Sequence, residues 1–304
     1  MSRALWPNLI LLGTLILAML LPGPAAEVRP AAPPVYYAGW AIEAYPEQSA
    51  ADMEAMVRRV VRAGANVVWI GHNNPGEVDA AKVEPGLSYA VYEACLDPAD
   101  PRHGAAVAIV EAQHRMLAAC RAVGVKVVLP VGYQIQMGRR WNEEHPDDLR
   151  RDATGAPLDI YGGGVSASFY APAYRRDIEA YYRWLDAELV RPYAGTILML
   201  NLADEPLGGD YSAHAEAEFR ARTGLGFADV EGDPSRQRLL GAFQSGVVAE
   251  YAAWSAALWA ETLKVRRSKV PLFTLLGFSF VPLVDGLFMI ILKDPEAARS
   301  MGLI

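Results

Sequence analysis

Two adjacent carboxylates that follow an apolar run are the clearest candidates for chemistry in this sequence. Asp204 and Glu205 come shortly after the apolar segment 196–200, in the stretch Leu-Asn-Leu-Ala-Asp-Glu-Pro. Two neighbouring carboxylates are costly to ionise together, so one of them can keep a raised pKa, as a general acid needs. A solvated strand end or a helix N-cap would use the same residues, and the pattern alone leaves both interpretations open.

Short apolar runs alternate with amphipathic stretches along the chain. The apolar runs predict strands at 35–42, 66–70, 125–131, 196–200 and 270–276. The amphipathic stretches predict helices at 49–63, 105–123, 172–190 and 238–264. Ser49 is the expected N-cap of the first helix, and Gly64 and Gly124 are the expected stop signals. This alternation is typical of βαβ units around a parallel sheet.

Two stretches are predicted to be loops. One carries Tyr89, Tyr92 and Cys95 after the second strand, and the other is a polar loop of about forty residues over 132–171.

The spacing of the predicted strands indicates an incomplete (β/α)8 barrel. Their starts lie on average (270 − 35)/4, or about 59, residues apart. Eight units of that length would need more than about 400 residues, which elaborated barrels reach but this chain of 304 residues does not. We therefore predict an α/β chain of the (β/α)8 type, truncated after five or six strands.

Polar and aromatic side chains follow each of the first four predicted strands. In a (β/α)8 barrel the reacting groups lie just past the C-terminal ends of the strands, because the βα loops converge there. The strand ends offer Trp40 and Glu43, then His72 and Asn73, then Tyr133, and finally Asn201, Asp204 and Glu205. We expect a substrate site built from these residues.

Three segments resemble motifs of known carbohydrate-cleaving enzymes. The stretch 198–206 resembles the Asn-Glu-Pro signature at the fourth strand of clan A glycoside hydrolases. The stretches 141–149 and 151–157 resemble the loop after the third strand in family 42 β-galactosidase-like enzymes, and 211–224 resembles the segment that follows their acid/base strand. The similarity covers residues 35 to 280 in order.

The resemblance implies a role for each of the two acids. Glu205 would protonate the glycosidic oxygen and later activate water, in a retaining mechanism with two carboxylates. The family's neighbouring Asn, which holds a sugar hydroxyl, falls at Asp204, and an ionised Asp cannot donate a hydrogen bond there. The family's nucleophile lies on a seventh strand that this chain lacks. Glu43 and Asp285 are the in-chain substitutes, and we argue against both.

Aromatic residues near the strand ends are candidate platforms for a sugar ring. Trp40, Tyr133 and Trp141 are predicted to stack on the apolar faces of sugars, with His72, Asn73 and Asn201 as hydrogen-bonding partners. Trp69 lies within the second predicted strand, which favours packing in the core.

The histidines and cysteines predict no metal site and no cofactor. Five scattered histidines show none of the spacings of a metal centre. Cys95 and Cys120 could form a disulfide after export or remain two buried thiols, and both readings stay open.

Charge and composition exclude some classes of partner. Lys and Arg number 28 and Asp and Glu 35, so 28 − 35 gives a formal charge of −7. No basic run interleaved with aromatics is present, which argues against a nucleic-acid partner. Hydrophobic residues make up 52%, enough for a large core. The oligomeric state stays open.

The N-terminal segment is predicted to direct export. Residues 1–26 have a basic start, an apolar run and small residues typical of a cleaved signal peptide, and 27–34 is a Pro/Ala linker before the domain at 35–304. We expect an extracellular or periplasmic protein, with an uncleaved anchor as the alternative. The apolar run 270–292 could also contact a membrane, but its prolines and Asp285 favour a buried strand and a following element.

The leading hypothesis is an exported glycoside hydrolase that acts on a carbohydrate with Glu205 as acid/base. The alternative is a non-catalytic sugar-binding or membrane-associated remnant of the barrel. An α/β hydrolase is disfavoured because no Gly-x-Ser-x-Gly elbow occurs.

Overall fold

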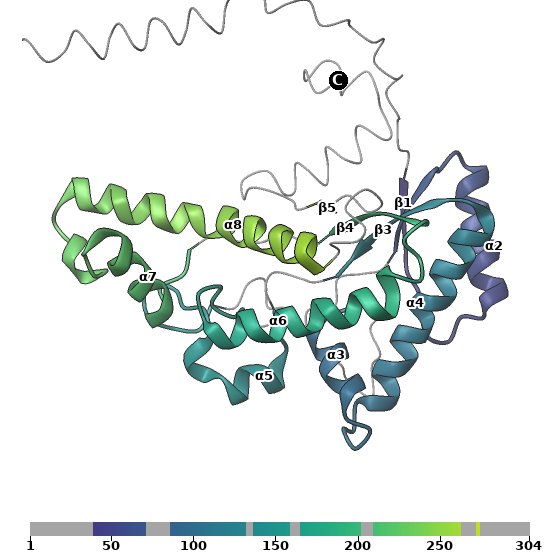
Figure 1. Ribbon diagram of the computed structural model, residues 1–304, viewed down its shortest axis with the longest axis horizontal. Coiled ribbons are helices and arrows are strands. Elements are labelled where there is room, and N and C mark those ends of the chain that lie inside the picture. The colour runs from purple at the N-terminus through teal and green to yellow at the C-terminus, as the bar shows by residue number, and fades with distance from the viewer. Residues whose placement is uncertain are drawn as a thin grey trace, which may run out of the picture. The chain divides into compact units, whose positions relative to one another are not determined.

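The computed structural model describes residues 39–70, 86–131, 136–158, 165–201, 209–262 and 272–273 (Figure 1). The chain divides into units 1–36 and 37–304, and all described residues belong to the second. The predicted signal peptide and linker lie outside the described residues, as does nearly all of 270–292. Within the described ranges, no helix has the length and apolar content to cross a bilayer.

Five parallel strands form one sheet in the order in which they occur along the chain. They are β1 Gly39–Ile42, β2 Val67–Ile70, β3 Lys126–Pro130, β4 Ile197–Asn201 and β5 Leu272–Phe273. Every neighbouring pair is parallel, as the βαβ pattern predicted. Sequential order with parallel pairing is the topology of a (β/α)8 barrel, and the described sheet is part of one.

Helical segments make the crossovers between the strands (Figure 1). They are α2 Ala50–Arg62, α3 Tyr89–Leu96, α4 His103–Val123, α5 Arg139–Glu144, α6 Pro172–Leu185, α7 Ala213–Thr223 and α8 Pro234–Thr262. Short 3-10 helices at Pro146–Asp148 and Ala228–Val230 and a short π-helix at Asp186–Val190 complete them.

Local signals explain where the predicted helices begin and end. Ser49 and Asp52 form a reciprocal capping box at the start of α2, since each side chain accepts from the other residue's backbone N–H. Gly124 ends α4 at φ 82°, a left-handed conformation that glycine adopts without steric cost. Both signals were read correctly from the sequence.

Two helices lie where loops were expected. Ser88 caps α3 by accepting from the N–H of Val91, and Tyr89 and Tyr92 then pack with Tyr181 of α6. The predicted loop over 132–171 contains α5. Both helices are too short to show a clear 3.6-residue period, and contacts with other elements stabilise them.

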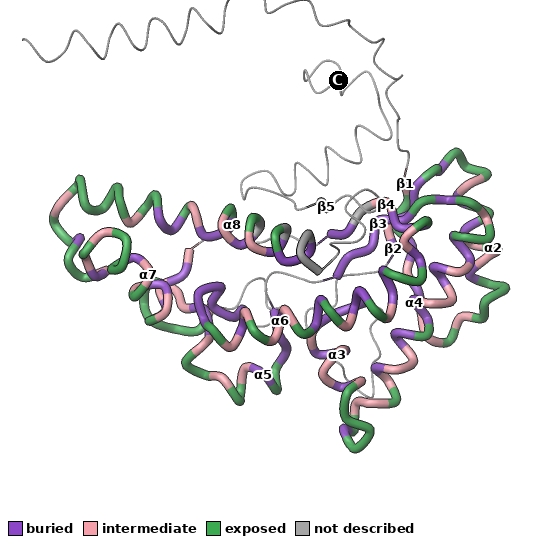
Figure 2. Tube along the Cα trace, in the orientation of Figure 1, coloured by how far each residue is buried: buried purple, intermediate pink, exposed green. Residues whose placement is uncertain are grey.

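The core lies on the helix side of the sheet. Ile42, Val68, Ile70 and Leu129 form a buried cluster with side chains of α2, α4 and α6, which Figure 2 shows as buried segments along the strands and helices. Strand side chains alternate between the two faces of the sheet. The strand residues that precede and follow these core residues therefore point to the opposite, inner face. In a (β/α)8 barrel this inner face is the one that lines the interior.

Both cysteines are free thiols, so the disulfide alternative is not realised. Cys120 is fully buried on α4, and burial raises its pKa to about 12. Cys95 on α3 is half-buried, and burial together with the nearby Glu188 carboxylate raises its pKa to about 11. Both side chains therefore stay neutral at physiological pH.

These raised pKa values predict low thiol reactivity in the folded chain. The thiolate is the nucleophile, so neither thiol should react rapidly with Ellman reagent at pH 8, and Cys120 should react only on unfolding. Two thiols per chain should titrate in concentrated guanidinium without reductant. A Cys95→Ser variant isolates Cys120 as the control. Failure to titrate any thiol in denaturant would indicate a disulfide and contradict this structure.

Candidate functional site

Four predicted site residues fall among the described residues. They are Trp40, Glu43, Trp141 and Asn201. The other five, His72, Asn73, Tyr133, Asp204 and Glu205, lie outside the described residues. The described part of the site therefore consists of the strand ends and the segments that flank 202–208.

Asn201 is the last residue of β4 and lies at the carboxyl end of the sheet. Its Cα partners are Pro130 on β3 and Phe273 on β5, and its backbone carbonyl accepts from the N–H of Val131 at 2.9 Å. The side chain is 0% exposed, and among the described residues neither amide atom has a hydrogen-bond partner. A buried amide without partners is costly, which marks this position for a ligand or an ordered water.

Glu43 follows β1 and turns toward the inner face. Ile42 and Ala44 on either side of it both belong to the helix-side core, so the alternation continues beyond the strand. The half-buried carboxylate accepts a hydrogen bond from the hydroxyl of Tyr45. Glu43 and Asn201 thus share the inner face at the carboxyl end, three strands apart.

The two strand tryptophans lie on opposite faces of the sheet. Trp40 pairs with Val68, so it lies on the helix-side face of the edge strand β1, where it is 51% exposed. Trp69 lies between Val68 and Ile70, which places it on the inner face, and it is not part of the helix-side core. The inner face of a (β/α)8 barrel is itself filled by packed side chains, so the core packing expected of Trp69 stays a prediction. The exposed position of Trp40 on the helix-side face counts against a platform at the strand ends.

Trp141 is enclosed by its own loop. The indole is 1% exposed, its Nε1 donates to Asp177 at 2.9 Å, and the His145 ring stacks on it at 4.4 Å between centroids. An indole that is this deeply buried has no open face for a sugar. This burial counts against the predicted stacking role and assigns Trp141 to the packing of α5 against α6.

A buried polar network fixes the chain where it leaves 202–208. The Ser168 hydroxyl donates to Asp210 Oδ2 at 2.6 Å, and the Ser212 N–H donates to Asp210 Oδ1 at 2.9 Å. Gln244 of α8 bonds both the N–H and the carbonyl of Asp210. Ser168, Asp210 and Ser212 are each 0% exposed. The network brings together the loop after β3, the segment after β4 and α8.

Arg150 supplies the positive charge beside this network. Its side chain is 1% exposed, and its Nε donates to the carbonyl of Gly209. Burial lowers the pKa of the guanidinium to about 10, and the Asp210 carboxylate opposes the shift. Arg150 therefore remains charged at neutral pH. Sequence reasoning missed Arg150, Ser168 and Asp210, because their partners lie far apart in the chain and no local pattern joins them.

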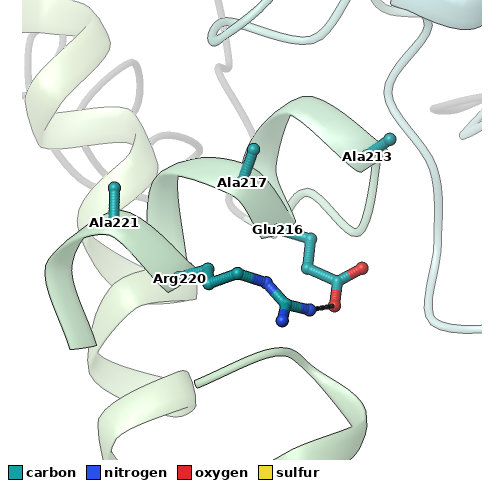
Figure 3. Close-up of a pocket in the computed structure, with 5 residues that line it drawn as sticks. All are labelled: Ala213, Glu216, Ala217, Arg220 and Ala221. Atoms are coloured by element: carbon teal, nitrogen blue, oxygen red, sulfur yellow. Dashed lines mark hydrogen bonds and ion pairs between the residues drawn. The ribbon is translucent and has the colours of Figure 1, made fainter. Parts of the chain in front are cut away.

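Two hollows occur on the described surface away from the strand ends. One, of about 450 Å³, lies on α7 over Ala213, Ala217 and Ala221, beside the ion pair of Glu216 and Arg220 at 3.1 Å (Figure 3). The other, of about 290 Å³, is lined by residues 121, 124–126, 192–193 and 195–196 at the opposite, amino end of β3 and β4. Among the described side chains, no three of His, Cys, Asp or Glu come close enough to share a metal ion.

Comparisons with known proteins give only distant likenesses. No protein-family model matches the chain, and no curated protein matches it. Similar solved structures include a β-galactosidase from Bacillus circulans sp. alkalophilus, with 15% identity and TM-score 0.41 over 79% of this chain and 36% of that one. An α-galactosidase from Lactobacillus brevis has 12% identity and TM-score 0.40 over 79% of this chain and 27% of that one.

A third similar structure is the endo-β-1,4-mannanase from Thermotoga petrophila, with 14% identity and TM-score 0.38 over 73% of this chain and 40% of that one. The chain thus spans only 27–40% of the length of these three proteins. The fold assignment rests on the strand order and crossovers described above.

Removing one hydroxyl from the buried network tests its contribution to stability. Ser168→Ala leaves Asp210 Oδ2 without its donor, so we expect the free energy of unfolding to fall by about 1–3 kcal/mol. Urea denaturation followed by circular dichroism measures the change. Ser235→Ala, at an exposed serine, is the matched control and should change stability by less than about 0.5 kcal/mol. Equal effects at the two positions would contradict the network.

Proposed function

We propose that this chain is an exported, carbohydrate-active protein of the glycoside hydrolase type, with Glu205 as general acid/base and Asp204 beside it. The observation that carries the proposal is Asn201, a fully buried amide without a described partner on the inner face at the end of β4. The two acids follow it by three and four positions. The N-terminal segment and the resemblance of 198–206 to an acid/base strand support export and glycosidase chemistry.

The residues on either side of 202–208 are held by contacts with other elements. Asn201 is held in the sheet, and Gly209 and Asp210 are held by Arg150 and Gln244. In the proposed reaction Glu205 donates a proton to the glycosidic oxygen and then removes one from the attacking water.

The second carboxylate of a retaining mechanism is not assigned among the described residues. Glu43 lies on the inner face three strands from Asn201, and its carboxylate accepts a hydrogen bond from the hydroxyl of Tyr45. A retaining enzyme needs a second carboxylate about 5–5.5 Å from the acid/base. The second candidate function is therefore a sugar-binding chain that does not cleave its ligand.

Glu205→Gln separates the two functions. Hydrolysis of a panel of 4-nitrophenyl glycosides that includes the β-D-galactoside should fall by about 10²–10⁴-fold in kcat, because the amide cannot exchange the proton. The full-length chain and release of 4-nitrophenol give the measurement. Glu47→Gln, at an exposed residue near α2, is the matched control and should keep wild-type rates.

A wild-type chain that binds sugar but releases no 4-nitrophenol would support the binding function instead. Unchanged hydrolysis in Glu205→Gln would remove Glu205 from the mechanism.

A further inference from the structure

We infer that the hollow at the amino end of β3 and β4 binds the phosphoryl group of a small phosphate monoester. The hollow has a volume of about 290 Å³ and lies at the end of the sheet opposite to Asn201. The end of α4, the start of β3 and the segment 192–196 before β4 line it. This ligand class goes beyond the proposed function and does not depend on it.

The residues that line the hollow carry two positive charges and no negative charge. Arg121 lies in the last turn of α4, and Lys126 is the first residue of β3. Within the described ranges neither side chain forms an ion pair with a carboxylate. A phosphate monoester carries a charge of about −1.5 to −2 at pH 7, which matches two cations, whereas a carboxylate would neutralise only one.

Arg121 is not needed to cap the end of α4. The backbone N–H groups of Gly124 and Val125 donate to the carbonyl of Cys120 at 2.9 and 3.1 Å, so the helix end is closed by its own main chain. The guanidinium makes no hydrogen bond to any described residue and lies over the ring of Tyr193, 4.9 Å from the centroid. Its N–H groups are therefore available to a ligand.

Tyr193 is a fixed platform for this guanidinium. The side chain is buried, and its hydroxyl donates to the carbonyl of His114 at 3.2 Å. The imidazole of His114 in turn lies 3.0 Å from the carboxylate of Glu188. A guanidinium held against an aromatic ring keeps its donors directed along its edge. Because it is already positioned, it loses less side-chain freedom when a ligand binds.

Lys126 and Thr196 add donors beside Arg121. The Lys126 Nζ donates to the carbonyl of Gly195 at 2.7 Å, which uses one of its three N–H groups and leaves two. Thr196 also lines the hollow and offers a hydroxyl. A phosphoryl group has three strong acceptor oxygens for such a set, whereas a guanidinium fork alone satisfies both oxygens of a carboxylate.

The size of the hollow favours an ester over free phosphate. Pockets for small molecules begin at about 300 Å³, so a volume of about 290 Å³ leaves space beside the anion. A Cβ atom added to Gly124 or Gly195 would meet no other part of the chain within 4 Å, so both sides are open. Pro192, in the same lining, supplies apolar surface for the ester group.

The test measures phosphate affinity in charge variants of the full-length chain. Inorganic phosphate, phenyl phosphate and acetate are the probes, followed by calorimetry and ³¹P NMR. Arg121→Gln and Lys126→Gln should each weaken binding of phenyl phosphate by about tenfold, because each removes one charged donor. Arg238→Gln, which removes the same charge from an exposed position on α8, is the matched control and should keep wild-type affinity.

Gly195→Asp tests the same site by adding a charge. The open space beside Gly195 accepts a side chain, and a carboxylate there should pair with Lys126 and weaken phenyl phosphate binding by more than about tenfold. Gly195→Ala places only a methyl group in this space and should keep wild-type affinity. Thermal unfolding of both variants checks that they fold.

Tighter binding of phenyl phosphate than of inorganic phosphate, lost in Arg121→Gln but not in Arg238→Gln, would support the inference. Equal affinity for the two phosphates would overturn the ester as ligand and assign the hollow to free phosphate. A wild-type chain that binds neither phosphate, or binds acetate as tightly, would overturn the site. Glycoside hydrolysis by Arg121→Gln should equal that of the wild type, so failure of one proposal leaves the other standing.

Discussion

Alternation of side chains across the parallel sheet is the constraint on which the rest of this structure depends. Ile42, Val68 and Leu129 must face the helices, because that is where their apolar area is buried. Since the period of a strand is two residues, the side chains between them must turn to the inner face. A slip of one residue would place Trp69 and Asn201 among the helices and turn the core residues inward.

The long βα loops cannot rely on sheet hydrogen bonds, so they are held by buried polar contacts. Ser168, Asp210 and Gln244 satisfy one another, and Arg150 adds a charge within the same buried volume. In a low-dielectric interior a half-made network is costly, which favours one arrangement of these segments over many. Next to this network, the segments of the resemblance on either side of β4 meet directly, since the Tyr211 N–H donates to the carbonyl of Arg151 at 2.9 Å and His214 lies 2.6 Å from the Asp148 carboxylate.

The elements with a clear pattern of apolar residues could be predicted from the sequence. The elements that depend on contacts between residues far apart in the chain could not. The five strands and α4 follow from apolar runs and a long amphipathic stretch, and Gly124 follows from its place after that stretch. α3 and α5 are short, so their helical state depends on tertiary packing that no window of sequence shows.

The faces of the strands were the hardest feature to predict. A strand in a parallel sheet is buried on both faces and reads as a continuous apolar run, so Val-Val-Trp-Ile does not reveal which way its tryptophan points. The direction of the Trp69 side chain follows from the register of β2 against β3 and from which β2 residues belong to the helix-side core. The helix-side position of Trp40 could not be predicted for this reason, and Asp210 was missed because its partners lie 42 and 34 residues away.

A retaining mechanism would make two separate demands on this chain. Proton transfer in the proposed reaction requires Glu205, and retention also requires a second carboxylate within about 5.5 Å of it. Strand register and alternation place Glu43 and Asn201 on the inner face at the carboxyl end of the sheet, where such groups must lie. The amide of Asn201 is buried without a described partner, a cost that an apolar residue at the same position would avoid.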